Sequence, residues 1–214
     1  MISLLLPASL LAQTSVVWTF DSLESIGGLA PHLLGKPRII DTPVGKAIEF
    51  NGKTDAIYLD QHPLAGATTF TWEVLFRPDG DGAPEQRFFH LSALDPKTGA
   101  DTQVRMLFET RLRKGGWCLD SYVSSTKGGL PLLNCDKIYP TDKWYVATTT
   151  YDGKMLRNYV NGELQGEGKL EFAPQDAGHT SIGTRINKRD YFKGAVRMSR
   201  FTRRAMQPAE FMKP

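Results

Sequence analysis

The stretch Trp144-Tyr-Val-Ala-Thr-Thr-Thr-Tyr-Asp-Gly153 is followed almost at once by Leu156-Arg-Asn-Tyr-Val-Asn-Gly162. Both runs are rich in β-branched and aromatic residues, which fit a pleated, half-buried strand. The first run ends at Asp-Gly and the second at Asn-Gly, two pairs that tolerate the positive φ of tight hairpin turns. The stretch therefore predicts two antiparallel strands of a meander, each closed by a turn.

Similar strand-like runs, separated by Gly, Pro, Asn and Asp, recur along the whole chain of 214 residues. No long segment has a helical period; only 207–211 is expected to form a terminal helical turn. No linker or solenoid repeat divides the chain, so residues 16–211 are expected to form a single domain. Many short strands with this punctuation predict an all-β, two-sheet antiparallel sandwich. The expected strands are 16–20, 46–50, 56–59, 69–77, 86–91, 104–111, 117–123, 144–151, 155–160, 181–185 and 192–201.

Two further segments join the opening stretch in a recognisable order: Gly45-Lys-Ala-Ile-Glu-Phe-Asn-Gly52, and the closing Ser181-Ile-Gly-Thr-Arg185 with Phe192-Lys-Gly-Ala-Val-Arg-Met-Ser-Arg-Phe-Thr-Arg-Arg-Ala-Met206. Together the three blocks resemble the laminin-G-like, concanavalin A-like lectin/glucanase jelly-roll family. The resemblance implies a jelly-roll sandwich. It leaves the function open, because this fold carries lectins, adhesive modules, hydrolases and lyases. An acidic pair often follows the isoleucine of the closing block, and Arg197-Met198 stands there instead.

The N-terminus predicts export. Residues 1–12 are apolar, uncharged and too short to span a bilayer, as expected of a secretory signal peptide. No other run approaches about 18 apolar residues, so no membrane span is expected in the mature protein. The chain is therefore expected to be secreted, periplasmic or extracellular. Its formal net charge of +3 is too small to indicate a partner.

Cys118 and Cys135 are the two cysteines. They flank Thr126-Lys127 symmetrically, so a hairpin that turns there would place them directly opposite each other. In an oxidising compartment that register favours a cross-strand disulfide. No C-x-x-C pair or histidine cluster accompanies them, so zinc is not expected.

Period-two alternation separates a core face from a polar face on four consecutive predicted strands, 69–77, 86–91, 104–111 and 117–123. If these strands are neighbours in one sheet, their polar side chains collect on one face. Asn158 is added because it stands where the alternation calls for an apolar residue, and this indicates a buried polar contact or a position facing a cleft. The candidate ligand-binding residues are Glu73, Arg77, Gln86, His90, Arg105, Glu109, Arg111, Asp120, Tyr122 and Asn158. The alternative is a solvated face laced with ion pairs.

Three functions fit this face, and no catalytic residue is asserted. The first is non-catalytic recognition of a glycan, with arginines holding carboxylate or sulfate groups and Tyr122 stacking on a sugar. The second is a polyuronate lyase on the concave sheet, with His90 and Tyr122 as the acid–base pair and Arg111 neutralising the substrate. The third is a structural or adhesive protein-interaction domain.

Other chemistries lack support in the sequence. The E-x-D-x-E strand of glucanases of this fold is absent, because Arg111 follows Glu109-Thr110. A retaining hydrolase, which needs two carboxylates across the scissile bond, is therefore disfavoured. No nucleic-acid motif is present. No cofactor is expected, although calcium at Asp21 and Glu24 stays open because acidic turns supply oxygen ligands.

Basic residues dominate the chain from 185 to 214, where only two carboxylates oppose them. This bias favours an anionic partner or a solvated sheet edge that discourages aggregation. The basic residues are Arg185, Lys188, Arg189, Lys193, Arg197, Arg200, Arg203, Arg204 and Lys213.

Overall fold

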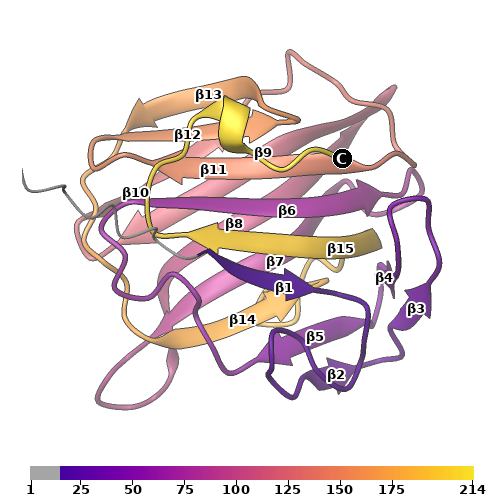
Figure 1. The fold of residues 1–214 in the computed structure, drawn as a ribbon, viewed down its shortest axis with the longest axis horizontal. Coiled ribbons are helices and arrows are strands. Elements are labelled where there is room, and N and C mark those ends of the chain that lie inside the picture. Colours follow the sequence, from indigo (N-terminus) through magenta and orange to yellow (C-terminus); the bar gives the residue numbers. More distant parts are fainter. Residues whose placement is uncertain (1–14) are drawn as a thin grey trace, which may run out of the picture.

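The computed structural model describes residues 15–214, which form two antiparallel sheets packed face to face (Figure 1). The predicted all-β, two-sheet antiparallel jelly roll is confirmed. We name each sheet after one of its inner strands. The β6 sheet runs β13 (Glu163–Lys169), β12 (Met155–Val160), β11 (Tyr145–Tyr151), β6 (Phe70–Pro78), β15 (Lys193–Thr202), β4 (Ala47–Asn51) and β3 (Arg38–Ile40), and β1 (Val16–Thr19) also pairs with β15. The β8 sheet runs β10 (Gly128–Leu133), β9 (Gly116–Ser125), β8 (Asp101–Arg113), β7 (Glu85–Leu94), β14 (Gly178–Ile182), β5 (Ala56–Leu59) and β2 (His32–Leu34).

The opening stretch of the sequence forms β11 and β12, which pair with Thr149 opposite Asn158. The turn between them is closed by Asp152, whose Oδ1 accepts hydrogen bonds from the backbone N–H groups of Lys154 (2.9 Å) and Met155 (2.8 Å). At the far end of β12, Asn161 has φ 52° and Gly162 has φ 82°. Both predicted turns are therefore formed by the left-handed backbone that their residues allow.

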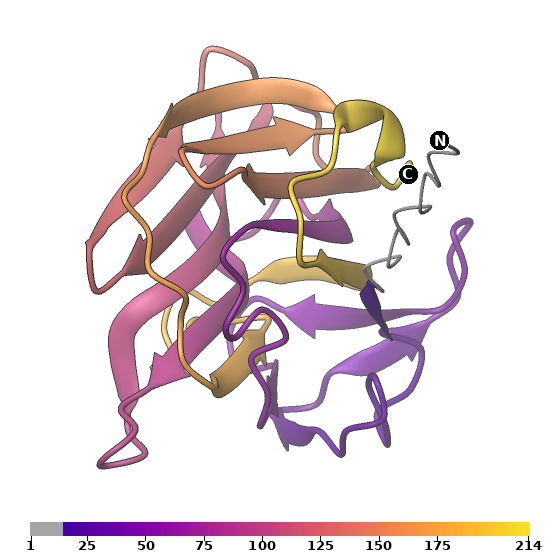
Figure 2. The ribbon, with the colours of Figure 1, turned by 60° about the vertical axis from the view of Figure 1, so that its left-hand side comes forward.

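Aromatic side chains from both sheets meet in the core between them. Trp72 on β6 lies 4.2 Å from Phe108 on β8, measured between ring centroids, and Phe76 stacks on Phe88 at 4.0 Å. The edge-on separation of the layers is visible in Figure 2. Because truncating a buried Phe or Trp to Ala costs about 3–5 kcal/mol, these contacts across the sandwich dominate its stability.

The sheet to which β6 belongs differs from the sequence expectation. The shared polar face required β6 to lie beside β7, β8 and β9, but β6 lies in the opposite sheet, between β11 and β15. The acidic, glycine-rich segment after Pro78 carries the chain across to β7. Glu73 and Arg77 therefore face away from the other candidate residues, and the expectation that they share one polar face is wrong.

A β-bulge in β7 changes which of its side chains face outward. The pairing of β7 with β8 shifts between Arg87 and Phe89, and both Phe88 and Phe89 are buried in the core. Strict alternation placed Arg87 on the core face and Gln86 on the polar face, and the bulge reverses both assignments. Gln86 is fully buried; its Nε2 donates to the Ala83 carbonyl (2.8 Å) and its Oε1 accepts from the Lys193 backbone N–H (2.7 Å).

The C-terminal segment covers part of the outer face of the β6 sheet (Figure 1). The predicted helical turn is present as a 3₁₀ turn at Pro208–Glu210. Phe211 and Met206 pack with Tyr159 of β12 in a small apolar cluster. This packing removes part of that face from contact with a ligand.

The signal peptide expected at residues 1–12 lies outside the described residues, and the 16–211 domain boundary stays a prediction. Within residues 15–214 no helix has the length and apolar character needed to cross a membrane.

Cys118 and Cys135 form a disulfide, with their Cα atoms 5.2 Å apart. The β9–β10 hairpin turns at Thr126-Lys127, since Ser125 pairs with Gly128. Cys135 lies two residues beyond Leu133, the last residue of β10, whose partner is Asp120. Continuing that register places Cys135 opposite Cys118, so the predicted disulfide and its hairpin are confirmed.

We predict that replacing both cysteines by serine lowers the free energy of unfolding by about 3 kcal/mol, because the closed loop restricts the unfolded chain. Urea denaturation of the wild type and the Cys118→Ser/Cys135→Ser variant measures the difference. Equal midpoints and slopes would show that the bond does not stabilise the fold.

Asn158 forms a buried polar contact, the first of the two alternatives that its position indicated. Its side chain is fully buried, and Nδ2 donates to Ser121 Oγ (3.1 Å) on β9 and to the Leu132 carbonyl (3.0 Å) on β10. The residue therefore links the two sheets from inside the sandwich. Because it does not face solvent, its predicted role as a ligand contact is not supported.

We predict that Asn158→Leu destabilises the protein by about 1–3 kcal/mol even though it makes the core more apolar, because Ser121 Oγ and the Leu132 carbonyl lose their donor. Adding Ser121→Ala should recover part of that loss in a double-mutant cycle of unfolding free energies. Simple additivity of the two substitutions would contradict the proposed link.

Candidate functional site

The outer face of the β8 sheet brings together six of the ten predicted site residues. They lie on three adjacent strands and, with Arg87, which the alternation had misplaced, make one polar surface. The six are His90 on β7, Arg105, Glu109 and Arg111 on β8, and Asp120 and Tyr122 on β9. Glu73, Arg77, Gln86 and Asn158 are not on this face.

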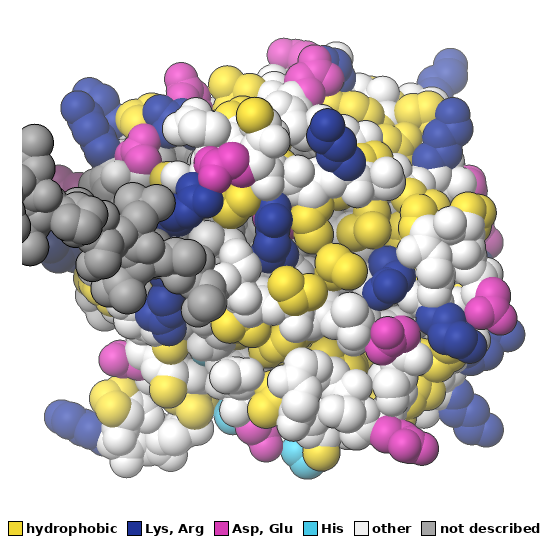
Figure 3. All heavy atoms as spheres, viewed as in Figure 1, with side chains coloured by type: hydrophobic (Ala, Val, Ile, Leu, Met, Phe, Trp, Pro, Cys, Tyr) yellow, Lys and Arg dark blue, Asp and Glu magenta, His cyan; other side chains and the backbone are white. Residues whose placement is uncertain are grey.

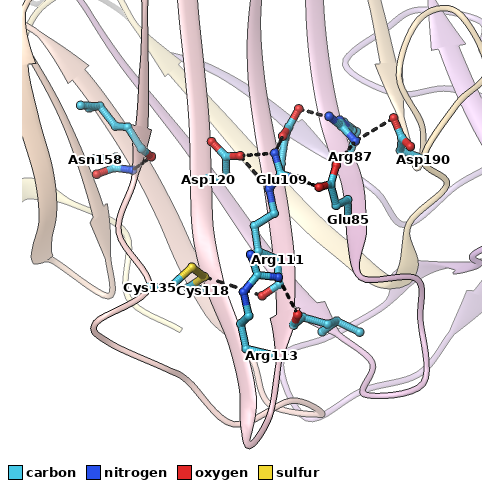
Figure 4. Close-up of polar contacts among 12 residues, drawn as sticks. Glu85, Arg87, Glu109, Arg111, Arg113, Cys118, Asp120, Cys135, Asn158 and Asp190 are labelled. Atoms are coloured by element: carbon cyan, nitrogen blue, oxygen red, sulfur yellow. Dashed lines mark hydrogen bonds and ion pairs between the residues drawn. A yellow bond between two sulfur atoms is a disulfide. The ribbon is translucent and has the colours of Figure 1, made fainter.

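Four of these side chains form what we call the ion network: Arg87, Glu109, Arg111 and Asp120 (Figure 4). Arg87 Nε lies 2.6 Å from Glu109 Oε1, and Arg111 Nη2 lies 2.6 Å from Asp120 Oδ2 and 3.2 Å from Glu109 Oε2.

Two outer carboxylates close the ion network. Asp190 pairs with Arg87 Nη1 at 2.7 Å, and Glu85 pairs with both Arg87 and Arg111. The arginines of the network are thus already occupied by carboxylates of the protein itself.

Counted together with Glu85 and Asp190, the carboxylates of this cluster outnumber its arginines. Burial and, next, repulsion by Asp120 raise the pKa of Glu109 to about 7, against the opposing attraction of Arg87. Glu109 therefore holds a proton near neutral pH. Glu109 contacts both Arg87 and Arg111, and the ion network thereby joins β7, β8 and β9.

Beside the ion network lies a small cavity of about 150 Å³ that we call the His90 pocket. It is lined by His90 of β7, by residues of β8 that include Arg105, and by residues 185–187 of the loop after β14. Its lining residues are His90, Asp101, Thr102, Gln103, Arg105, Arg185, Ile186 and Asn187.

The hydrogen bonding of His90 fixes its tautomer. Nδ1 accepts the backbone N–H of Ile186 at 2.9 Å, so the ring proton of the neutral imidazole is on Nε2. Burial, and then the charges of Arg185 and Arg105, lower the pKa of His90 to about 3. The ring is thus a neutral donor at Nε2, and Nε2 is buried with no partner among residues 15–214.

Arg105 lines the His90 pocket and also contacts the ring of Tyr122 outside it. The Arg105 guanidinium lies 4.9 Å from the centroid of the half-exposed Tyr122 ring. Its Nη1 donates to the Gln103 carbonyl (3.0 Å) and to Gln103 Oε1 (2.8 Å). Its Nε is buried and has no partner within the described part of the chain.

The remaining two charged residues, Glu73 and Arg77, are held in structural contacts of the β6 sheet. Glu73 is fully buried; it pairs with Arg200 and accepts the Met212 backbone N–H at 2.6 Å. Arg77 pairs with Asp79 (3.0 Å) and Glu49 (3.3 Å). Figure 3 shows the face that carries these strands, where exposed hydrophobic atoms lie between scattered Lys and Arg side chains.

A larger hollow of about 570 Å³ lies at the β3–β4 edge, but most of its charges already have partners. Arg38 pairs with Glu49, Lys193 with Asp81, and Asp55 accepts the Lys36 backbone N–H at 2.9 Å. Size alone therefore does not make it the better site, and the His90 pocket is distinguished by its buried donors.

The calcium expectation is not supported by the geometry. Asp21 and Glu24 are exposed, and Asp21 Oδ1 accepts from Thr19 Oγ1 at 3.2 Å. Among residues 15–214 no group of three or more His, Cys, Asp or Glu side chains is arranged to hold a metal ion. Calcium binding stays an untested prediction.

Two residues of the site, Arg87 and Arg185, were not predicted. Arg87 was misplaced because a bulge is not visible in an alternation pattern. Arg185 was expected in the strand 181–185 and in the basic C-terminal run, but β14 ends at Ile182 and Arg185 lies on the loop after it. Three other basic residues of that run, Lys193, Arg200 and Arg204, are paired with carboxylates.

The architecture places the chain among the antiparallel jelly-roll β-sandwich proteins. A family model described as the concanavalin A-like lectin/glucanases superfamily, Laminin_G_3, matches residues 51–211, and the chain belongs to this family. None of the curated proteins matches the sequence.

Among solved structures, the chain is similar to domain 4 of AbnA, a GH43 extracellular arabinanase from Geobacillus stearothermophilus, which was solved in complex with arabinotriose. The TM-score is 0.65 and the sequence identity 19%, and the match covers 91% of this chain and 94% of that one. The binding domain of botulinum neurotoxin DC in complex with SialylT gives a TM-score of 0.64 at 9% identity, covering 92% of this chain and 49% of that one.

The binding domain of Paraclostridial Mosquitocidal Protein 1 gives a TM-score of 0.59 at 15% identity, covering 92% of this chain and 50% of that one. This chain thus spans about half the length of the two toxin binding domains. At these identities the likeness shows the fold.

We predict that Glu109→Gln flattens the pH dependence of stability. The folded state holds the Glu109 proton up to a pKa of about 7, whereas the unfolded chain releases it near 4.5. Between these pH values the folded state binds more protons, so this group lowers the free energy of unfolding as pH rises. The free energy of unfolding of the variant should therefore rise relative to that of the wild type as the pH increases from 5 to 8.

Chemical denaturation at several pH values measures this gain. Glu85→Gln is the matched control, because Glu85 belongs to the same surface but is exposed and its pKa is lowered. A stability difference between Glu109→Gln and the wild type that does not change with pH would rule out the raised pKa.

Proposed function

We propose that the protein is a non-catalytic glycan-recognition module that binds its ligand on the outer face of the β8 sheet. The observation that carries the proposal is the combination of a half-exposed aromatic ring, Tyr122, with buried donors that have no partner among residues 15–214, Arg105 Nε and His90 Nε2. Sugars offer an apolar ring face and a rim of hydroxyl acceptors, and this pairing of groups matches both.

The comparisons support the same class of ligand. Of the solved structures that share the fold, one holds arabinotriose and another is a toxin binding domain in complex with SialylT. Fold likeness alone does not transfer a function, so the site residues carry the argument.

The geometry does not favour the lyase alternative. His90 on β7 and Tyr122 on β9 both lie opposite Leu107 of β8, so one whole strand separates them. With strands about 4.8 Å apart, the backbones of the two residues are roughly 10 Å apart. Arg111 is occupied by Asp120, and a histidine with a pKa near 3 is a weak base at neutral pH.

We further propose that the protein works outside the reducing cytosol. The Cys118–Cys135 bond supports this placement, because disulfides persist in oxidising compartments. The expected signal peptide at 1–12 would deliver the chain there.

We predict that a glycan array probed with the labelled protein gives binding to a defined set of glycans, and that Tyr122→Ala weakens this binding roughly 5- to 30-fold through loss of the stacking surface. Trp144→Ala is the matched control, because Trp144 is also half-buried and has an arginine, Arg77, 5.9 Å over its ring, but it lies directly before β11 of the other sheet.

Silence across neutral and acidic glycans would instead favour the adhesive, protein-interaction alternative. Incubation with alginate and polygalacturonate should produce no absorbance from unsaturated uronates. Turnover in that assay would overturn the non-catalytic assignment.

A further inference from the structure

We propose that the His90 pocket binds an oxyanion, a carboxylate or a sulfate group, and so selects acidic glycans for the outer face of the β8 sheet. The inference rests on the proposed function and deepens it, since it names the chemistry that the site selects. It is carried by three cationic or donor groups, on His90, Arg105 and Arg185, that meet at one cavity.

The first group is the imidazole of His90, which is 1% exposed. The bond from the Ile186 backbone N–H to Nδ1 commits the ring to donating from Nε2. A buried N–H with no acceptor costs folding free energy, and within residues 15–214 no acceptor is offered to it. An oxygen placed in the pocket would satisfy it.

The second and third groups are the guanidinium groups of Arg105 and Arg185. Neither forms an ion pair with a carboxylate of the described residues, in contrast to Arg87 and Arg111 on the same face. Burial, and then the charge of Arg185, lower the pKa of Arg105, as expected for two cations held close together. An anion between them would relieve this repulsion and accept the free N–H of Arg105.

The acidic group on the rim does not fill this role. Asp101 lines the pocket, but its Oδ1 accepts from His179 Nδ1 at 3.2 Å. The side-chain oxygen of Gln103 likewise already accepts a hydrogen bond, from Arg105 Nη1. The pocket therefore keeps a net positive charge and donors in excess of acceptors.

The size of the cavity restricts what enters it. Its volume is about 150 Å³. That space suits one carboxylate or sulfate group and the edge of the sugar ring that carries it. The next ring of the chain would then lie toward Tyr122, which Arg105 joins to the pocket.

The test titrates the full chain with sodium acetate, with sodium sulfate and with sodium glucuronate, each against sodium chloride at constant ionic strength. The side-chain N–H signals of Arg105 Nε and His90 Nε2 are followed by nuclear magnetic resonance. We expect saturable shifts of both signals, and the acetate and sulfate arms distinguish which oxyanion the pocket prefers.

Arg185→Ala, read at Arg105 Nε, should weaken this anion binding at least about tenfold, the effect of removing one charge-assisted hydrogen bond. Arg105→Lys, read at His90 Nε2, should weaken it as well, because the planar fork is lost. Arg113→Ala is the matched control: Arg113 is an exposed arginine of the same strand whose side chain bonds only its neighbour's carbonyl (2.9 Å) among the described residues. It should leave the anion affinity unchanged.

The inference is overturned if the shifts are absent or rise linearly without saturation, or if Arg113→Ala weakens binding as much as Arg185→Ala. Its failure is separable from that of the proposed function. Glycans that bind equally well after their carboxyl groups are reduced or their sulfates removed would overturn the oxyanion pocket and leave glycan recognition intact. Anion binding without any glycan binding would overturn the proposed glycan recognition and leave the anion-binding pocket intact.

Discussion

A single extra residue in β7 determines which side chains reach the outer face of the β8 sheet. Because the ladder to β8 shifts between Arg87 and Phe89, two consecutive phenylalanines, Phe88 and Phe89, enter the core. The residues on either side, Arg87 and His90, are then both turned outward. Without the bulge, one of the two would lie in the core and one phenylalanine would be exposed. The ion network and the His90 pocket both depend on this bulge. Bulges are frequent beside functional sites, where they change the direction of a side chain.

The arginines of this face fall into two kinds. Arg87 and Arg111 are each paired with three carboxylates of the protein. Arg105 and Arg185 have no such carboxylate among residues 15–214, although they repel each other. The first pair holds β7, β8 and β9 together as a rigid platform. The second pair remains free to recognise a ligand, and Tyr122 extends that recognition over the open surface.

Much of this fold could be read from local sequence, because its signals are local. The Asp152-Gly153 and Asn161-Gly162 turns, the two-residue turn that aligns Cys118 with Cys135, and the alternation of β8 and β9 all depend on neighbouring residues. The assignment of β6 failed because strands adjacent in sequence are not always adjacent in a sheet, and a crossover after Pro78 carries no sign of its destination. The predicted faces of Gln86 and Arg87 were wrong because a bulge interrupts the alternation of side chains along β7. Arg185 was expected at the end of a strand over 181–185, but β14 ends at Ile182, and Arg185 lies on the following loop, where Ile186 donates to His90.

The central claim is that ligand recognition takes place on the outer face of the β8 sheet. It is tested most directly by a chemical-shift map of the backbone amides, recorded while the protein is titrated with the glycan that it binds most tightly. The account predicts perturbations confined to β7, β8 and β9 around His90, Arg105 and Tyr122, together with the segment 185–187. Perturbations that instead follow the outer face of β6, β11 and β15, with the His90 region unchanged, would contradict it.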